Sequence, residues 1–239
     1  MARVLQDPNH LLPARLEQRL ALDIASAALF SAQYCEGPSL LIVSSHELAA
    51  EALQRTSGRV ILVAEAPHVL ESFQRLMGQS VVHQQTIMNA ILADSANGWM
   101  GERYCCALWA SPQVVTWPHR LRSIDAALAE GALLAIVLAG PLARLLAPFR
   151  SRSAAGEAAP PFPRLRQQLV DLGYDIEHCY SIGGLGAVRS ATLARFGNIM
   201  ARPDLVDRWE AGYRSALSPT ESGRLALARV LLARKRIKA

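Results

Sequence analysis

Lysine is nearly absent from this sequence. Only Lys235 and Lys238 occur among its 25 basic residues, so arginine carries almost all of the positive charge. The formal net charge is +5, and the one dense basic cluster is Arg234-Lys235-Arg236 with Lys238. A nucleic-acid-binding protein gathers its basic residues on one face or along one helix. We therefore attribute the arginine content to coding bias and do not expect a nucleic-acid partner.

Long apolar runs and cysteine motifs are also missing. The longest apolar stretch, residues 131–147, is interrupted by glycine, proline and arginine, and it is too short to cross a bilayer. The first 20 residues contain no apolar signal core. No C-x-x-C pair occurs, so the four cysteines are expected to be buried free thiols in a reducing compartment. These absences predict a soluble, cytoplasmic protein of bacterial type without a membrane span.

Three well-known site motifs are absent as well. The six histidines show no metal-ligand spacing such as i, i+4 pairs, so no metal cofactor is expected. The sequence has no G-x-S-x-G nucleophile motif and no Walker A pattern of glycines and lysine. It therefore argues against a zinc enzyme, an α/β-hydrolase and a P-loop nucleotidase.

Apolar residues, in contrast, are plentiful. They make up 51% of the 239 residues, while charged residues make up 19%, which is enough apolar material for one large core. We expect an N-terminal helical segment over residues 1–38 and an α/β domain over residues 39–239. Within that domain, residues 150–163 are predicted to form a flexible loop because they are small, polar and rich in proline. A helical insertion is predicted over residues 187–216.

Several short apolar runs do not alternate with polar residues, and most are followed by a helix-like segment. Such runs are typical of strands buried on both faces of a parallel sheet with helices over it. Strands are expected at residues 40–43, 59–64, 80–84, 104–110, 133–138 and 174–182, with a last strand or helix at 225–233. Helices are expected at residues 13–33, 46–55, 67–77, 118–129, 141–149 and 164–172. This order predicts one twisted, mostly parallel, Rossmann-like sheet.

Four stretches of the sequence resemble the class I S-adenosylmethionine (SAM) dependent methyltransferases. They are residues 60–76, 117–140, 165–182 and 228–236, and the resemblance extends over residues 15–234. The first resembles the second strand of the family, which ends in an acid before a helix that starts near proline. The resemblance implies a mostly parallel, seven-stranded sheet with helices on both faces.

The same resemblance implies SAM as cofactor. In the family, the acid after the second strand, here Glu65, accepts hydrogen bonds from both ribose hydroxyls. The family's glycine-rich turn after the first strand is replaced here by Ser44-Ser45-His46, whose hydroxyls and helix amides could bind the SAM carboxylate. A plain helix cap at the serines and a surface role for Glu65 remain open. The implied cofactor site consists of Glu65, Ser44, Ser45, His46, Thr86 and Ile87.

The loop after the strand at 104–110 is expected to face an apolar substrate, with aromatic residues from before, within and after that strand lining the pocket. Its expected members are Trp99, Tyr104, Ser111 and Trp117. His119 is the candidate general base, because its ordinary pKa lies near neutrality. The alternative is an exposed histidine in the first turn of a helix.

Two functions follow from these features. The first is a SAM-dependent methyltransferase that acts on a small, largely apolar molecule. The second is a non-catalytic protein of the same fold, a pseudoenzyme that has lost SAM binding and serves as an interaction or scaffold subunit. The glycine-free turn favours the second function and the order of elements favours the first. The expected partner is a small-molecule substrate or another protein, and a homo-oligomer is compatible with the sequence.

Overall fold

The computed structural model describes residues 39–43, 60–64, 103–110, 117–142, 161–196, 203–217, 219–220 and 225–237. The chain divides into two compact units. The first, which we call the hairpin unit, comprises Met1–Ala21, Ala139–Ala158 and Cys179–Arg229. The second, the sheet unit, comprises Leu22–Leu138, Ala159–His178 and Val230–Ala239.

The sheet unit is built on parallel strands with apolar side chains. Strand β1 (Ser39–Val43) pairs in parallel with β2 (Val60–Ala64) on one side and with β3 (Tyr104–Ala110) on the other. Strand β3 also pairs in parallel with β4 (Leu128–Ala139). Nearly every described side chain of β1 and β3 is buried, as expected for strands covered on both faces.

Strand β4 contains a bulge near its start. The register with β3 moves from Tyr104 opposite Leu128 to Cys106 opposite Leu133, so β4 advances three residues more than its partner. Gly131 lies inside this bulge and has a φ of 75°, a left-handed conformation that glycine adopts without steric strain. The sequence predicted that Gly131 would separate a helix from a strand beginning at residue 133. That boundary was wrong, because the bulge lets the strand start at Leu128 and pass through the glycine.

Helix α6 (Phe162–Asp171) and strand β5 (Tyr174–Ile182) follow as a unit. Leu165 and Leu169, one helical turn apart, are fully buried and form the inner face of α6. Gly173 ends the helix with a φ of 87° and donates its amide hydrogen to the Val170 carbonyl, so β5 can begin at the next residue. The sequence predicted this helix, its glycine stop and the following strand, and all three are confirmed.

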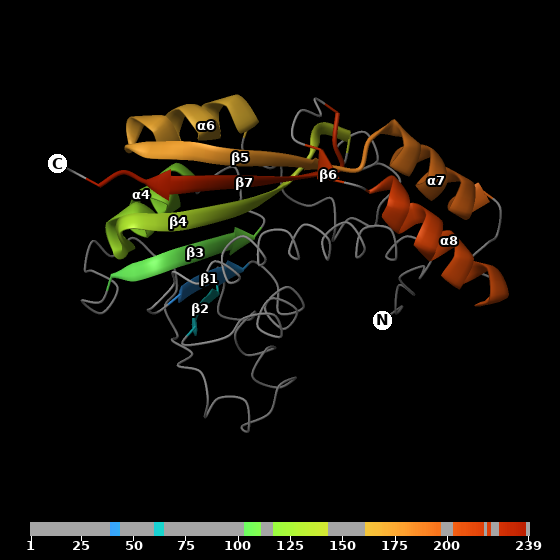
Figure 1. Cartoon of the computed structure of the whole chain (residues 1–239), viewed down its shortest axis with the longest axis horizontal. Helices are drawn as coiled ribbons and strands as arrows, with labels where there is room; N and C mark the ends of the chain where they lie inside the picture. Colours follow the sequence, from blue (N-terminus) through green and yellow to red (C-terminus); the bar gives the residue numbers. More distant parts are fainter. Residues whose placement is uncertain are drawn as a thin grey trace, which may run out of the picture. The chain divides into compact units, whose positions relative to one another are not determined.

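The strand order of the sheet is β2-β1-β3-β4-β7-β5-β6. Strand β7 (Ala228–Lys235) lies between β4 and β5, and Figure 1 shows that it runs opposite to both. Strand β6 (Pro219–Thr220) pairs antiparallel with the end of β5. The α/β sheet with helices is confirmed, but the sheet is mixed. One of the seven strands that the structure describes is the unpredicted β6, and the strand predicted at 80–84 lies outside the described residues.

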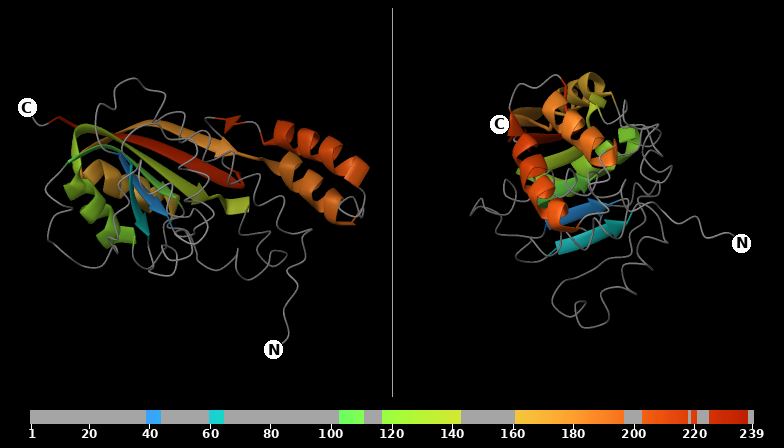
Figure 2. Two further views of the ribbon diagram at one scale, coloured as in Figure 1. Left: turned by 90° about the horizontal axis from the view of Figure 1, so that it is seen from below. Right: turned by 90° about the vertical axis from the view of Figure 1, so that its right-hand side faces the viewer.

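The hairpin unit contains helices α7 (Leu185–Phe196) and α8 (Pro203–Ala216). Figure 2 shows them side by side and running in opposite directions. The Trp209 indole N–H donates to the Ser190 carbonyl across 3.2 Å, and the Trp209 and Tyr213 rings are stacked with centroids 4.9 Å apart. The hydrogen bond joins α8 to α7, and the stacked rings lie one turn apart on α8. Both helices overlap the helical stretch predicted over residues 187–216.

Helix α4 spans Trp117–Ala127. The helix predicted at 118–129 is confirmed, although it ends at Ala127. The segment at 225–233, predicted as a strand or a helix, is strand β7. The predicted helices at 13–33, 46–55 and 67–77 lie outside the described residues.

Candidate functional site

The parallel strands β1 and β2 end side by side. Val43, the last residue of β1, is the register partner of Ala64, the last residue of β2. In open α/β sheets, ligands bind outside the carboxyl ends of the strands. The residues that come next in the sequence are Ser44 and Glu65, both of which lie outside the described part of the chain. Each is therefore attached directly to a strand end at the edge where a ligand is expected.

The described residues next to the carboxyl ends of these strands form an apolar layer. Ile42 is paired with Trp109, and Trp109 is paired in turn with Ile136. All three side chains are fully buried. Polar groups that act beside such a layer are shielded from water, which strengthens their interactions with a bound ligand. The layer can support a cofactor site but contributes no titratable group of its own.

Three of the predicted site residues are described, and the structure does not gather them at one place. Trp117 is the first residue of α4 and is buried, while His119 is exposed in the first turn of the same helix. Tyr104 is fully buried at the amino end of β3, six residues or about 20 Å of strand from Ala110. Tyr104 is therefore remote from the carboxyl ends of the strands. The other predicted site residues lie outside the described residues: Ser44, Ser45, His46, Glu65, Thr86, Ile87, Trp99 and Ser111.

In the hairpin unit, the end of β4 is closed by backbone contacts that the sequence did not reveal. Gly140 donates its amide hydrogen to the Leu227 carbonyl at 2.8 Å, and Leu142 donates to the Ala226 carbonyl at 3.0 Å. A Cβ at Gly140 would overlap the Ala226 carbonyl oxygen. Gly140 is thus required for close backbone approach rather than for contact with a ligand. The only sequence signal was a glycine directly after a long apolar strand.

Groups of metal ligands and helices able to span a membrane are both absent from the residues that the structure describes. Within these ranges, no group of three or more histidine, cysteine, aspartate or glutamate side chains is arranged to hold a metal ion. None of the helices that the structure describes is long and apolar enough to cross a membrane.

Neither a protein family model nor a curated protein matches the sequence. Solved structures do match. A SAM-dependent methyltransferase from Mesorhizobium loti aligns with a TM-score of 0.53 and 13% identity over 92% of this chain and 98% of its own. A geranyl diphosphate methyltransferase in complex with SAM aligns with a TM-score of 0.56 and 12% identity over 94% of this chain and 90% of its own.

The chain has a class I methyltransferase-like fold. The cyclase SpnF has a similar fold, with a TM-score of 0.58 and 11% identity over 92% of this chain and 82% of its own. At these identities the likeness establishes the fold alone, because one fold supports different activities. In this methyltransferase-like fold, the paired ends of β1 and β2 form the candidate functional site.

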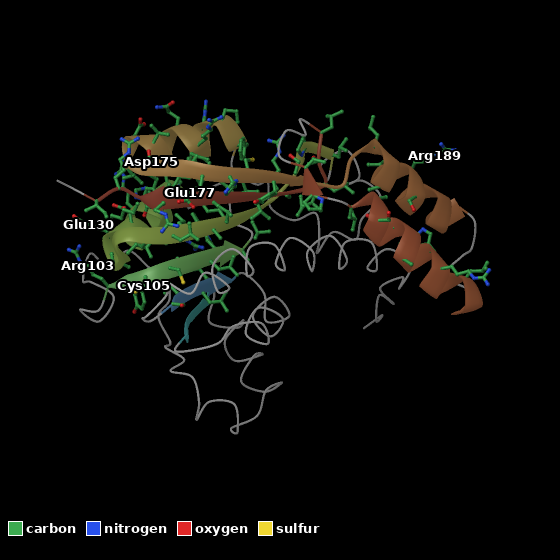
Figure 3. The ribbon with its side chains drawn as sticks, viewed as in Figure 1. Arg103, Cys105, Glu130, Asp175, Glu177 and Arg189 are labelled. Carbon is green, nitrogen blue, oxygen red and sulfur yellow. The ribbon has the colours of Figure 1, made fainter. Side chains whose placement is uncertain are left out.

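The described residues of the basic cluster, 234–236, lie at the amino end of the parallel strands, beside the start of β4 and away from the candidate site. Figure 3 labels Asp175 and Glu177 along β5. Arg234 forms an ion pair with Glu177 at 2.5 Å, and Arg236 forms one with Asp175 at 2.7 Å. Lys235 forms the third pair, with Asp125, at 3.0 Å. Carboxylates of the same chain therefore pair with these three cations.

The sequence contained a signal for these pairs. Asp175 and Glu177 are two residues apart on β5, and Arg234 and Arg236 are two residues apart along β7 and the residue after it. Side chains two residues apart in a strand share one face of a sheet. In antiparallel neighbours, the first acid of one strand meets the last base of the other. Local sequence patterns did not show that β5 and β7 are neighbours in the sheet.

Proposed function

We propose that this protein binds SAM at the paired carboxyl ends of β1 and β2 and transfers its methyl group to a small, largely apolar molecule. The observation that carries the proposal is the pairing of Val43 with Ala64. Because each of these residues is the last of its strand, Ser44 and Glu65 start from neighbouring positions at one edge of the sheet. The methyltransferase-like fold supports SAM rather than another nucleotide as the ligand.

The donor set is chemically suited to SAM. The Glu65 carboxylate has two oxygens that can accept hydrogen bonds from the two ribose hydroxyls. The hydroxyls of Ser44 and Ser45, with the amides of the helix predicted to follow, would hold the SAM carboxylate in the absence of glycine. His46 belongs to the same turn, and Thr86 and Ile87 would form an apolar adenine pocket. Bound SAM supplies an electrophilic methyl group on a sulfonium centre.

The substrate is proposed to be apolar because the described surroundings are apolar. Trp109 and Ala110 end β3, and Trp117 is buried at the start of the next helix. Trp99 and Ser111 would extend this pocket. A geranyl diphosphate methyltransferase among the structural neighbours supports an apolar methyl acceptor. Positioning alone accelerates methyl transfer, and His119 is the candidate base when the acceptor must lose a proton.

The glycine-free turn favours a second function. In place of glycines, Ser44-Ser45-His46 carries three side chains where close approach to SAM is expected. A non-catalytic scaffold of this fold would tolerate such side chains. Several finer predictions accompany both functions: helices on both faces of the sheet, the division at residue 38, the flexible loop over residues 150–163 and a cytoplasmic location.

Thermal unfolding in the presence of SAM tests the first function against the second. A ligand at about 100 times its dissociation constant stabilises the native state by about 2.7 kcal/mol. For a chain of this size, this free energy corresponds to a rise in the melting temperature of about 5–10 °C. An unchanged melting temperature at about millimolar SAM would remove the methyltransferase function and favour the scaffold.

A further inference from the structure

The end of β7 is attached to its neighbours by two kinds of ionic contact. The first kind is a partly buried site for the Lys235 ammonium group, which we call the seat. The ammonium group donates to the Asp125 carbonyl at 2.5 Å and to the Leu128 carbonyl at 3.1 Å, and it pairs with the Asp125 carboxylate at 3.0 Å. Two of these contacts are hydrogen bonds to backbone carbonyls, and the third is an ion pair that adds charge attraction. The Lys235 side chain is only 13% exposed, so this seat is largely protected from salt.

The seat also lies where a cation is favourable. Asp125 is in the last turn of α4, and Leu128 directly follows the helix. Carbonyl oxygens at a helix C-terminus lack partners within the helix and carry the negative end of its dipole. Lys235 therefore caps α4 and joins it to the end of β7.

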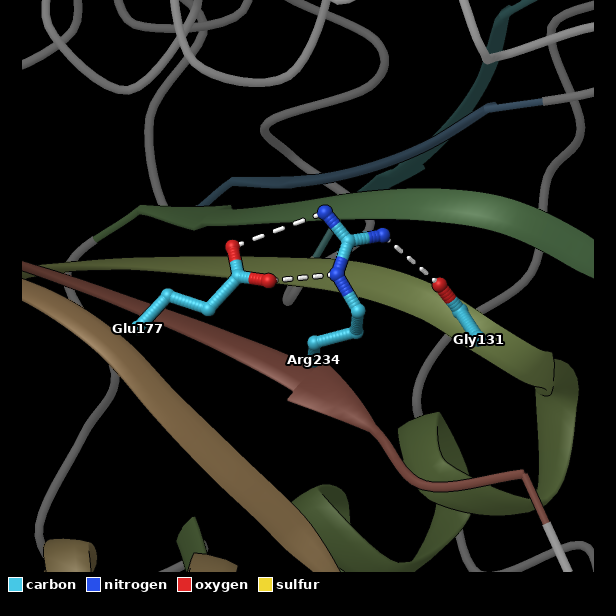
Figure 4. A network of polar contacts seen from close by, with 3 residues as sticks. All are labelled: Gly131, Glu177 and Arg234. Carbon is cyan, nitrogen blue, oxygen red and sulfur yellow. Dashed lines mark hydrogen bonds and ion pairs between the residues drawn. The ribbon is translucent and has the colours of Figure 1, made fainter.

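The second kind of contact consists of two exposed arginine arms. Figure 4 shows Arg234 between the Glu177 carboxylate and the Gly131 carbonyl, to which it donates at 3.1 Å. The carbonyl belongs to the bulge of β4. Arg236 donates to one carboxylate oxygen of Asp175 from two nitrogens, at 2.7 and 2.8 Å. The arginine side chains are 47% and 55% exposed, so salt screens both arms.

We propose that the end of β7 is a two-part clasp: the Lys235 seat holds it to α4 regardless of salt, and the Arg234 and Arg236 arms hold it to β5 and loosen as ionic strength rises. The clasp is a conformational device at the amino end of the parallel strands. It does not depend on SAM binding, since none of its residues belongs to the proposed cofactor site.

One backbone amide reports directly on the arms. The Arg236 amide donates to the Gly173 carbonyl at 2.9 Å, so opening of the arms exposes this amide to exchange with solvent. The amide of the fully buried Leu231, in the middle of β7, serves as the internal reference. Hydrogen exchange of both amides can be followed by NMR.

Raising NaCl from about 0.1 M to about 1 M shortens the Debye length from about 10 Å to about 3 Å. The clasp predicts that exchange of the Arg236 amide accelerates about threefold relative to that of Leu231. Equal salt dependence of the two amides in the unaltered protein would overturn the proposal, and this comparison requires no variant.

A double variant, Asp175→Asn with Glu177→Gln, removes both arms. Its Arg236 amide should exchange rapidly already at low salt and respond no further to NaCl. Glu130→Gln is the matched control, because Glu130 is an exposed carboxylate on β4 that belongs to none of the three pairs. The control should keep the salt dependence of the unaltered protein. Persistence of that dependence in the double variant would show that the arms do not cause it.

Discussion

The Gly140 amide and the Leu227 carbonyl are joined by a 2.8 Å hydrogen bond that holds two backbone segments of the hairpin unit together. The contact predicts that Gly140→Ala is strongly destabilising, because the added Cβ would overlap the Ala226 carbonyl. Overpacking of this kind costs about 1–3 kcal/mol in the free energy of unfolding. Urea denaturation measures it. Gly184→Ala is the matched control, because its Cβ would meet no atom within 4 Å. Equal stability of the two variants would contradict the close approach.

Tyr174 predicts a loss of stability at alkaline pH. Burial, with the Asp125 carboxylate nearby, raises the pKa of Tyr174. The unfolded chain therefore releases the phenolic proton from about pH 10 while the native state retains it, so stability falls as pH rises above that value. In Tyr174→Phe this contribution is absent. Melting temperatures between about pH 9 and pH 11 should fall less steeply in the variant. Parallel curves would show that Tyr174 is not shielded in solution.

The bulge of β4 predicts that a side chain at Gly131 lowers the free energy of unfolding through backbone conformation alone. Gly131 has a φ of 75°, but an added Cβ would come no closer than 3.8 Å to the Ile237 side chain. Gly131→Ala should therefore lower the free energy of unfolding by about 1–2 kcal/mol through left-handed strain. Gly131→Asn should lower it less, because asparagine tolerates this conformation better. Denaturant titration of both variants provides the test, and an alanine variant as stable as the unaltered protein would rule out the strain.

Much of the fold could be predicted from local patterns. Strands β3 and β5 have the predicted bounds, because each is a continuous run between clear boundaries, such as Gly173 before β5. Strand β6 was missed, because two residues that include a proline carry no strand pattern. The start of β4 was missed, because the bulge places Gly131 inside the strand, where the sequence predicted a boundary.

For the candidate site, the sequence could predict only which residues follow each strand. Glu65 was identified because it ends an apolar run, and the structure adds that this run ends beside β1. Pairings between distant segments were not predictable, since they depend on which strands become neighbours. Gly140 with Leu227 and Arg234 with Glu177 are examples. Tyr104, in contrast, is the first residue of a strand with the predicted bounds, so its distance from the carboxyl end of β3 was already implied by the sequence.

The most direct test of the proposed function is a calorimetric titration of the protein with the demethylated product of SAM. We expect saturable binding that weakens about tenfold or more in Glu65→Gln, because a hydrogen bond to a charged group contributes about 1.5–3 kcal/mol. Glu130→Gln, with the same change of charge on β4, should bind as tightly as the unaltered protein. Absence of binding at about millimolar ligand, or equal affinity in all three proteins, would contradict a SAM site at the paired ends of β1 and β2.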